Sequence, residues 1–322
     1  MQIKKSRKEQ VTFMSKKIVV ALGRSAFGET FPEQKANVKL AAHAVADLVE
    51  EGYQIVVTHS NGQQLGMVHS AMTEFSRTEP QYTVAPMSLC TAMSQGYIGY
   101  DLQNAIRTEV LNRGIFCTVS TIITQVKVSP FDKAFHNPSK IIGRVMNAAD
   151  AAAEERKGNY VVETKEGFRR IIASPQPIDI YEIDAIRTLL DAGQIVIAAG
   201  GGGIPVLEQG TTLKGASAVI EKDLTAGKLA ELLDADILLF LTGNEKAIRF
   251  YGTPQEILLE KLSLSQAKEF VKDNSFSEHG MRPKITAAIS YLEKKPEGRV
   301  VITKMQTARD ALKGKTGTEI LP

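Results

Sequence analysis

The chain has 322 residues, of which 43% are hydrophobic and 23% are charged, which is typical of a folded globular protein with one large two-lobed unit or two domains. Residues 1–13 carry four basic side chains and one acidic one, which accounts for the net charge of +3, so the rest of the chain is neutral and broad nucleic-acid binding is not expected. No apolar run reaches the roughly 18 residues of a membrane span, and two cysteines are too few for a disulfide scaffold, so we expect a cytoplasmic protein without a membrane partner.

The first 13 residues are expected to form a disordered N-terminal extension. A second, more natural start follows at Met14. A targeting peptide is the less favoured alternative, because no apolar segment follows the basic residues.

Beyond this extension, apolar runs rich in β-branched residues alternate with helical patterns. This alternation is typical of a mostly parallel sheet covered by helices on both faces. The first run, Lys17–Leu22, precedes a helix expected from about Glu33 to Glu50, which ends at Gly52. The other predicted strands are Gln54–Thr58, Ile115–Ile123, Ile195–Ala199, Ala216–Ile220, Asp236–Leu241 and Arg299–Thr303.

One region interrupts the alternation. Residues 159–173 show a hairpin pattern that turns at Lys165-Glu166-Gly167. We therefore expect a small subdomain, at about residues 128–173, inserted into the main sheet, with Ser174-Pro175-Gln176-Pro177 as a stiff linker back to the body.

Two loops that follow strands contain candidate phosphate-binding residues. The stretch ALGRSAFG (21–28) ends the first strand, but Arg24 and Ser25 stand where a phosphate-binding loop would prefer glycine and a small amide. The second strand ends in His59-Ser60-Asn61-Gly62, where backbone N–H groups at a helix start and the Asn61 amide could bind an anion. An ordinary strand–helix turn is the alternative. Both loops are expected at the carboxyl edge of the sheet, where open α/β sheets bind ligands.

Four consecutive glycines follow a buried strand in AAGGGGIPV (198–206). Such a run costs folding entropy and is favoured where the backbone must approach a ligand or another strand closely. Gly201 and Gly202 are therefore candidates for anion binding. A tight crossover loop without a ligand is the alternative.

Two further segments place lysines at expected element ends. Lys222 and Asp223 follow the apolar run that starts at Ala216. This pair suits phosphate chemistry, because the ammonium can neutralise the charge of a phosphoryl group in transfer and the carboxylate can hold the ammonium in position. Lys284 lies in the expected first turn of a helix, where a cation is disfavoured unless it meets an anion. A solvated ion pair and a solvated lysine are the alternatives.

Taken together, the chain from Met14 onward resembles carbamate kinases, which belong to the amino acid kinase fold family. The motifs that carry this resemblance are SQGYIGYDLQNA (94–105), TQVKV (124–128), FHNPSKIIG (135–143), SPQPIDI (174–180), AAGGGGIPV (198–206), GASAVIEKD (215–223), DADILLFLTG (234–243), YGTP (251–254), MRPK (281–284) and GKTGTEI (314–320).

The resemblance implies a three-layer α/β/α sandwich around an open, mostly parallel sheet, with a small protruding subdomain, over residues 14–322. It also implies reversible phosphoryl transfer between carbamoyl phosphate and MgADP, giving carbamate and MgATP, in a homodimer. The N-terminal lobe, about 14–194, would bind carbamoyl phosphate, and the C-terminal lobe, about 195–322, would bind ATP or ADP. Mg²⁺ would be held by the nucleotide phosphates, without a protein side chain as ligand.

The site residues implied by the resemblance fall into three groups. The catalytic group is Lys222, Asp223 and Lys284. The phosphate- and substrate-binding group is Gly23, Arg24, Ser25, Ser60, Asn61, Gly62, Gly201 and Gly202. The nucleotide-binding group is Lys222, Thr242, Gly243, Tyr251, Met281 and Lys284.

The departures from the family pattern gather on the carbamoyl phosphate side. The family reads Gly-Gly-Asn-Ala where this chain has residues 23–26, and His-Gly-Asn-Gly-Pro where it has residues 59–63. Ser129-Pro130 stands where the family has an Asp-Lys pair with a substrate-binding lysine, and Lys127 and Lys133 each lie three residues from Pro130.

These departures leave three functions open. Arg24 could fill the phosphate site, and the Cβ of Ser60 would be harmful if that position needs a positive φ, which would favour a silent nucleotide-binding homologue. Alternatively, the Arg24 guanidinium could bind phosphate or carboxylate, replace the missing lysine's charge, or serve a larger anionic acceptor. The third possibility is an ordinary enzyme of the carbamate kinase type.

Overall fold

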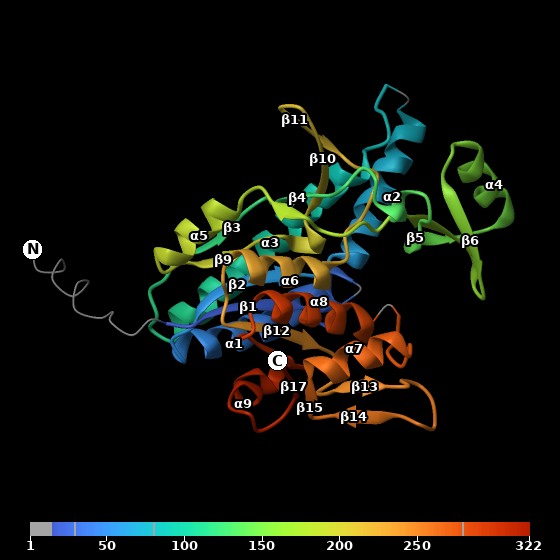
Figure 1. Ribbon diagram of the computed structural model, residues 1–322. Helices are drawn as coiled ribbons and strands as arrows, with labels where there is room; N and C mark the ends of the chain where they lie inside the picture. Colours follow the sequence, from blue (N-terminus) through green and yellow to red (C-terminus); the bar gives the residue numbers. More distant parts are fainter. Residues whose placement is uncertain (1–14, 29, 80, 279) are drawn as a thin grey trace, which may run out of the picture.

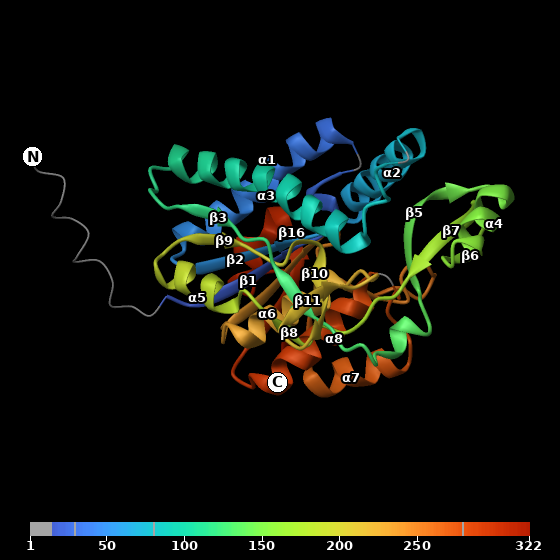
Figure 2. The same cartoon turned by 90° about the horizontal axis from the view of Figure 1, so that it is seen from above.

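The computed structural model describes residues 15–28, 30–79, 81–278 and 280–322, so the predicted extension lies outside the described residues. Within them, an eight-stranded sheet lies between two layers of helices (Figure 1, Figure 2). This arrangement confirms the predicted three-layer α/β/α fold.

The central sheet is mostly parallel, and its strand order is β15-β17-β16-β12-β1-β2-β9-β3. The pairing of β16 with β17 is antiparallel, so β15 and β17 run against the other strands. The strands are β1 (Lys17–Leu22), β2 (Gln54–His59), β3 (Val119–Thr121), β9 (Ile195–Ile197), β12 (Ile237–Thr242), β15 (Lys261–Ser263), β16 (Arg299–Lys304) and β17 (Thr318–Leu321).

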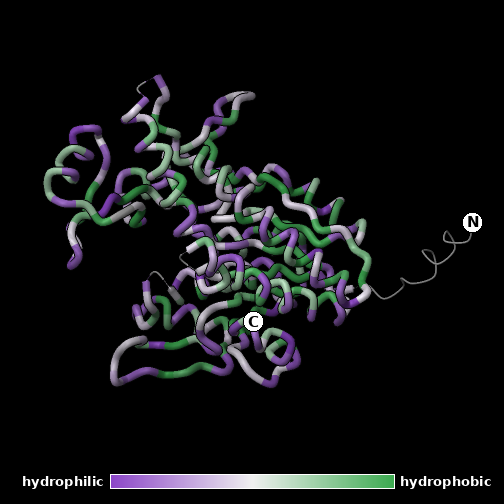
Figure 3. Tube along the Cα trace, turned by 180° about the vertical axis from the view of Figure 1, so that it is seen from behind, coloured by the Kyte–Doolittle hydropathy of each residue, from purple (hydrophilic) through white to green (hydrophobic). Residues whose placement is uncertain are grey.

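Both faces of this sheet are buried, because side chains alternate along each strand. Along β1, Ile18 and Val20 pack on one side, and Val19 and Ala21 pack on the other. Figure 3 shows the resulting hydrophobic central layer inside a more hydrophilic periphery. The helices packed on the Ile18 side are α1 (Phe31–Glu50), α3 (Met87–Asn112) and α9 (Ala308–Leu312). The helices on the Val19 side are α5 (Ile183–Asp191), α6 (Lys222–Leu232), α7 (Leu264–Lys272) and α8 (Met281–Lys294).

Helix α1 confirms the helix predicted after the first strand, and it begins two residues earlier than expected. The side chain of Thr30 accepts a hydrogen bond from the N–H of Glu33, whose carboxylate bonds back to the N–H of Thr30. This capping box satisfies N–H groups that the first helical turn leaves unpaired. The helix ends before Gly52, whose φ of +85° suits glycine. No helix in the described part of the chain is long and apolar enough to cross a membrane.

Three smaller sheets surround the central one. A three-stranded sheet, β5-β7-β6, projects from the body together with α4 (Ala148–Arg156), and α2 (Gly62–Thr78) packs beside β5 (Figure 1). The remaining strands are β4 (Gln125–Lys127), β5 (Lys140–Met146), β6 (Tyr160–Thr164), β7 (Gly167–Ile172), β8 (Asp179–Ile180), β10 (Ile204–Gln209), β11 (Thr212–Gly215), β13 (Ala247–Arg249) and β14 (Ile257–Leu259). The pairing of β6 with β7 confirms the predicted hairpin.

Two predicted strands differ from the structure. Residues 216–220 form no strand and make only one isolated bridge, between Ala218 and Ala173. The prediction was wrong because this apolar run is buried by side-chain packing as a loop, with Ile220 and Val219 in two different hydrophobic clusters. Of the run 115–123, only the short edge strand β3 pairs, since β9, its one neighbour in the sheet, is itself three residues long.

The sheet continues across the expected division at residue 194. Strand β9, which follows this point in the sequence, lies between β2 and β3, which precede it. The division into two lobes and the exact limits of the subdomain therefore stay predictions.

Candidate active site

A cavity of about 840 Å³ opens at the carboxyl ends of β1, β2 and β12. Gly23 follows β1, Ser60 follows β2, and Thr242 ends β12, and all three line the cavity. The two loops that the sequence predicted at one edge of the sheet therefore meet there. This is the edge at which open α/β sheets bind ligands.

Three helices begin at the same cavity. Gly62 at the start of α2, Lys222 at the start of α6 and Gly280 just before α8 all line it. The N-cap residues of these helices make no side-chain hydrogen bond, although the Met281 N–H at the start of α8 donates to the hydroxyl of Ser277 at 3.0 Å. Their first-turn N–H groups lack partners within the helix, and the positive ends of their dipoles point to one place. The backbone alone thus favours a multiply charged anion in this cavity.

Asp223 joins the two predicted catalytic lysines. The Lys284 ammonium donates to Oδ2 of Asp223 at 2.9 Å, and the Lys222 ammonium donates to Oδ1. The three side chains are only 3–12% exposed. Lys284 also donates to the carbonyl of Gly280 at 3.0 Å, which fixes it at the start of α8. The solvated pair and the solvated lysine that the sequence left open are therefore not observed.

The charges of this cluster are set by its burial and by its members. Burial acts to raise the pKa of Asp223, but the charges of Lys222 and Lys284 outweigh it and lower this pKa to about 2. Burial lowers the pKa of Lys222, helped by Lys284 and opposed by Asp223. One carboxylate thus serves two ammonium groups, and a net positive charge remains for a ligand to neutralise.

The four-glycine turn lets three loops touch. A Cβ on Gly200 would lie 2.2 Å from Nε2 of His59, and one on Gly201 would lie 2.0 Å from Nδ2 of Asn61. A Cβ on Gly202 would lie 2.4 Å from the carbonyl oxygen of Ile220, two residues before Lys222. The close approach predicted for this run is confirmed. The glycine run packs the end of β9 against the loop at residues 59–62 and against the loop that leads to Lys222.

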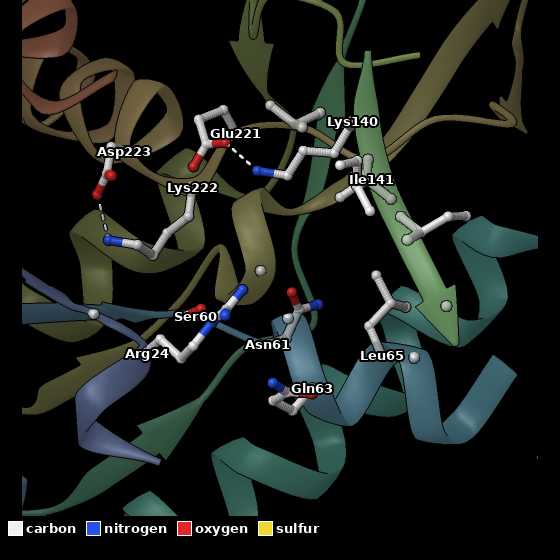
Figure 4. A pocket seen from close by; sticks show the side chains of 18 of the residues that line it. Arg24, Ser60, Asn61, Gln63, Leu65, Lys140, Ile141, Glu221, Lys222 and Asp223 are labelled. Atoms are coloured by element: carbon white, nitrogen blue, oxygen red, sulfur yellow. Dashed lines mark hydrogen bonds and ion pairs between the residues drawn. The ribbon is translucent and has the colours of Figure 1, made fainter. Parts of the chain in front are cut away.

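The two substituted loop positions differ in their consequences. Ser60 is not among the described residues with positive φ, and its N–H donates to the carbonyl of Leu22 at 3.0 Å, which continues the sheet pairing. The strain considered for Ser60 is therefore absent. Arg24 begins a 3₁₀ turn, and its side chain reaches into the cavity (Figure 4). Its Nη2 lies 3.5 Å from the position that a Cβ on Gly62 would take.

The protruding sheet contributes cations that the sequence did not single out. Lys140 on β5 lines the cavity and forms an ion pair with Glu221 (Figure 4). Arg169 on β7 lines the cavity too. Pro130 is not among the lining residues. Lys140 thus brings a cation from the protruding sheet to the cavity, and it stands within the FHNPSKIIG motif that carried the family resemblance. Ser129-Pro130 remains a departure from the family pattern.

Positive charge dominates the cavity lining. The described lining residues include five cations and two carboxylates, and both carboxylates are already paired with lysines. The cations are Arg24, Lys140, Arg169, Lys222 and Lys284, and the carboxylates are Glu221 and Asp223. An excess of three positive charges suits polyanionic substrates.

Most of the predicted site residues meet at this cavity. Those that line it are Gly23, Arg24, Ser25, Ser60, Asn61, Gly62, Gly201, Lys222, Asp223, Thr242, Gly243 and Lys284. Gly202, Tyr251 and Met281 do not. Met281 is 6% exposed and part of the core, whereas Tyr251 is 59% exposed. Nucleotide binding by Tyr251 and Met281 therefore stays a prediction.

The described residues contain no group of three or more His, Cys, Asp or Glu side chains placed to hold a metal ion. The two carboxylates of the cavity are engaged by lysines. The expectation that nucleotide phosphates hold Mg²⁺ stays a prediction.

Comparison with known proteins gives the family. A model of the amino acid kinase family matches residues 16–304. The chain belongs to the amino acid kinase family. Within it, this kinase is 45% identical over 308 residues to the carbamate kinase-like protein YqeA of Escherichia coli (95% of this chain and 99% of that protein). It is 40% identical over 306 residues to carbamate kinase 3 of Staphylococcus aureus (94% and 99%).

Solved structures agree with this assignment. The carbamate kinase of Giardia lamblia bound to AMP-PNP superposes with a TM-score of 0.89 at 34% identity, over 96% of this chain and 99% of that one. The resemblance to carbamate kinases drawn from the motifs is therefore confirmed, and the chain is a carbamate kinase-like phosphotransferase.

Proposed function

We propose that this amino acid kinase catalyses the reversible transfer of a phosphoryl group between carbamoyl phosphate and MgADP, giving carbamate and MgATP. The observation that carries the proposal is the Asp223 carboxylate shared by Lys222 and Lys284 in a cationic cavity. Phosphoryl transfer requires mainly positioning and stabilisation of charge on the oxygens of the moving group. Two buried ammonium groups held by one carboxylate supply both.

The proposed step needs no general base. An oxygen of the ADP β-phosphate attacks phosphorus, the bond from phosphorus to the carbamoyl oxygen breaks, and its electron pair stays on the carbamate. Both the attacking and the leaving oxygen are anionic, so no proton moves. This agrees with a cavity in which the carboxylates Glu221 and Asp223 are both bound to lysines and not available as bases.

In this proposal, different residues of the cavity have different roles. Lys222 and Lys284 neutralise the charge that spreads over the transferring oxygens, and Asp223 holds them in place. The loops at Gly23 and Gly62 hold carbamoyl phosphate, and Thr242 and Gly243 face the nucleotide. Mg²⁺ bound to the nucleotide phosphates supplies further charge neutralisation.

The structure supports turnover more than a silent homologue. The backbone at Ser60 is unstrained, and Lys140 provides a cation from the protruding sheet. Arg24, Ser25 and Ser129-Pro130 remain as departures from the family pattern.

The deciding experiment measures ATP formation from carbamoyl phosphate, ADP and Mg²⁺ with purified protein, and Lys222→Ala is the control. Turnover that is lost in the control supports the proposal, and turnover should also stop when EDTA removes Mg²⁺. No ATP above the control, in protein shown by calorimetry to bind ADP, would reject it.

A further inference from the structure

Arg24 is a cavity cation without a protein partner. Its guanidinium has no hydrogen bond or ion pair with any described residue, although an arginine carries five N–H donors. The carboxylates that line the same cavity, Glu221 and Asp223, are taken by Lys140, Lys222 and Lys284. The donors of Arg24 therefore face open space in the cavity.

The surroundings of Arg24 add positive potential. Its Nη2 and Nε lie 3.5 and 3.9 Å from the Cβ position of Gly62, the first residue of the 17-residue helix α2. The start of a helix carries the positive end of its dipole, so a guanidinium is disfavoured there. This helix start has no side-chain cap. An anion between Arg24 and the start of α2 would satisfy both groups.

The position of Arg24 matches the substrate side of the cavity. Arg24 follows β1 and faces the loop after β2 (Figure 4), whereas Thr242 ends β12 and Gly243 follows it. The family pattern has glycine at this position, so a family enzyme places only backbone here. An arginine adds a planar fork that matches two oxygens of a phosphate or carboxylate, which a lysine cannot do.

We propose that Arg24 binds the anionic group of the non-nucleotide substrate and sets the affinity of this enzyme for it. The ligand chemistry is a phosphoryl or carboxylate oxyanion, which an acyl phosphate carries in one direction of the reaction and its carboxylate carries in the other. The role rests on the proposed function. It makes Arg24 a specificity-determining residue that replaces backbone contacts of the family pattern.

The kinetic test compares Arg24→Ala, Arg24→Lys and the control Arg77→Ala. Arg77 is an exposed arginine at the other end of α2, paired with Glu74. Loss of a charged hydrogen-bond donor should raise KM for carbamoyl phosphate about tenfold to hundredfold in Arg24→Ala, with KM for MgADP within about twofold of wild type. Arg24→Lys should recover part of this loss, and Arg77→Ala should change neither KM.

A binding test separates this inference from the proposed function. The melting temperature is measured against inorganic phosphate concentration, in saturating ADP and Mg²⁺, because a ligand of the folded state raises it. Wild type and Arg77→Ala should rise with phosphate, and Arg24→Ala should not. That result supports the Arg24 site even if no turnover is found and the proposed function fails. An equal rise in all three proteins, or a lower KM for carbamoyl phosphate in Arg24→Ala, would overturn it.

Discussion

Lys140 on the protruding sheet forms an ion pair with Glu221, the residue immediately before Lys222. This pair joins the projecting part of the molecule to the start of α6, at the cavity (Figure 4). Because Lys140 lines the cavity, Lys140→Ala should lower kcat/KM for carbamoyl phosphate about a hundredfold, the cost of one lost preorganised donor. Steady-state kinetics of ATP formation provide the measurement.

Two variants sharpen this prediction. Glu221→Gln keeps the Lys140 ammonium but removes its partner, so kcat/KM should fall less than in Lys140→Ala, while hydrogen exchange over β5 should become faster. Lys133→Ala removes an exposed cation of the preceding loop that does not line the cavity, and it should leave kcat/KM within about twofold. Equal losses in Lys133→Ala and Lys140→Ala would contradict a specific role for Lys140.

The lysine pair around Asp223 should behave as one unit. Lys222→Ala and Lys284→Ala should each lower kcat by about a hundredfold to a thousandfold, and the double variant should lose much less than the product of the two. Asp223→Asn leaves two buried ammonium groups without their shared carboxylate, so it should also lower the free energy of unfolding by about 3 kcal/mol. Lys228→Ala, further along α6 and paired with Glu231, is the matched control. Additive effects of the two lysine variants on the free-energy scale would show that they act independently.

Much of this site could be predicted from the sequence, because the ends of buried strands and the run of glycines are visible in it. The loops at Arg24 and Ser60 follow buried strands, and parallel strands bring such ends to one edge. Gly200 and Gly201 are glycine because His59 and Asn61 occupy the space of a side chain.

The remaining features depend on tertiary contacts that local pattern does not encode. Residues 216–220 read as a strand, yet they are buried as a loop. Ser60 has no positive φ, and its N–H donates to the carbonyl of Leu22 on the neighbouring strand. Lys140 is the first residue of β5 and pairs with Glu221 at the cavity, and nothing in the spacing of the chain places those two residues together.

The close contact at Gly201 predicts a large cost for a single methyl group. Gly201 has a φ of +66°, and its Cβ position lies 2.0 Å from the buried Asn61 amide, which donates to Ser94 at 2.8 Å. Gly201→Ala should therefore cost about 3 kcal/mol of stability and most of the activity, through strain and overpacking together. Gly193 has a similar φ of +77° with nothing within 4 Å of its Cβ position, so Gly193→Ala should cost only about 1 kcal/mol. Urea unfolding gives both values, and equal costs would mean that the contact with Asn61 does not matter.

The homodimer implied by the family resemblance predicts an exposed apolar face, and α3 offers one. Leu89, Met93 and Tyr100 lie on one stripe of this helix and are 47%, 38% and 67% exposed. We expect light scattering after size exclusion to give twice the mass of the chain, and Met93→Glu to give the single mass. Leu40→Glu, on an exposed position of α1, should stay dimeric. A monomeric wild-type protein would reject the dimer.

His59 should make the stability of the protein depend on pH. Burial lowers the pKa of its imidazole to about 4, from its ordinary value of 6.5, and the side chain lies between Phe27 and Gly200. The unfolded chain therefore binds more protons than the folded one between about pH 6.5 and 4, so stability is full above this window and falls as the pH drops through it. Between pH 7 and pH 5 the His59 contribution should fall by about 2 kcal/mol. Urea unfolding at both pH values should show a loss smaller by this amount in His59→Gln than in wild type, while the exposed His136→Gln should match wild type. An equal pH-dependent loss in wild type and His59→Gln would mean that the imidazole is protonated in the folded protein.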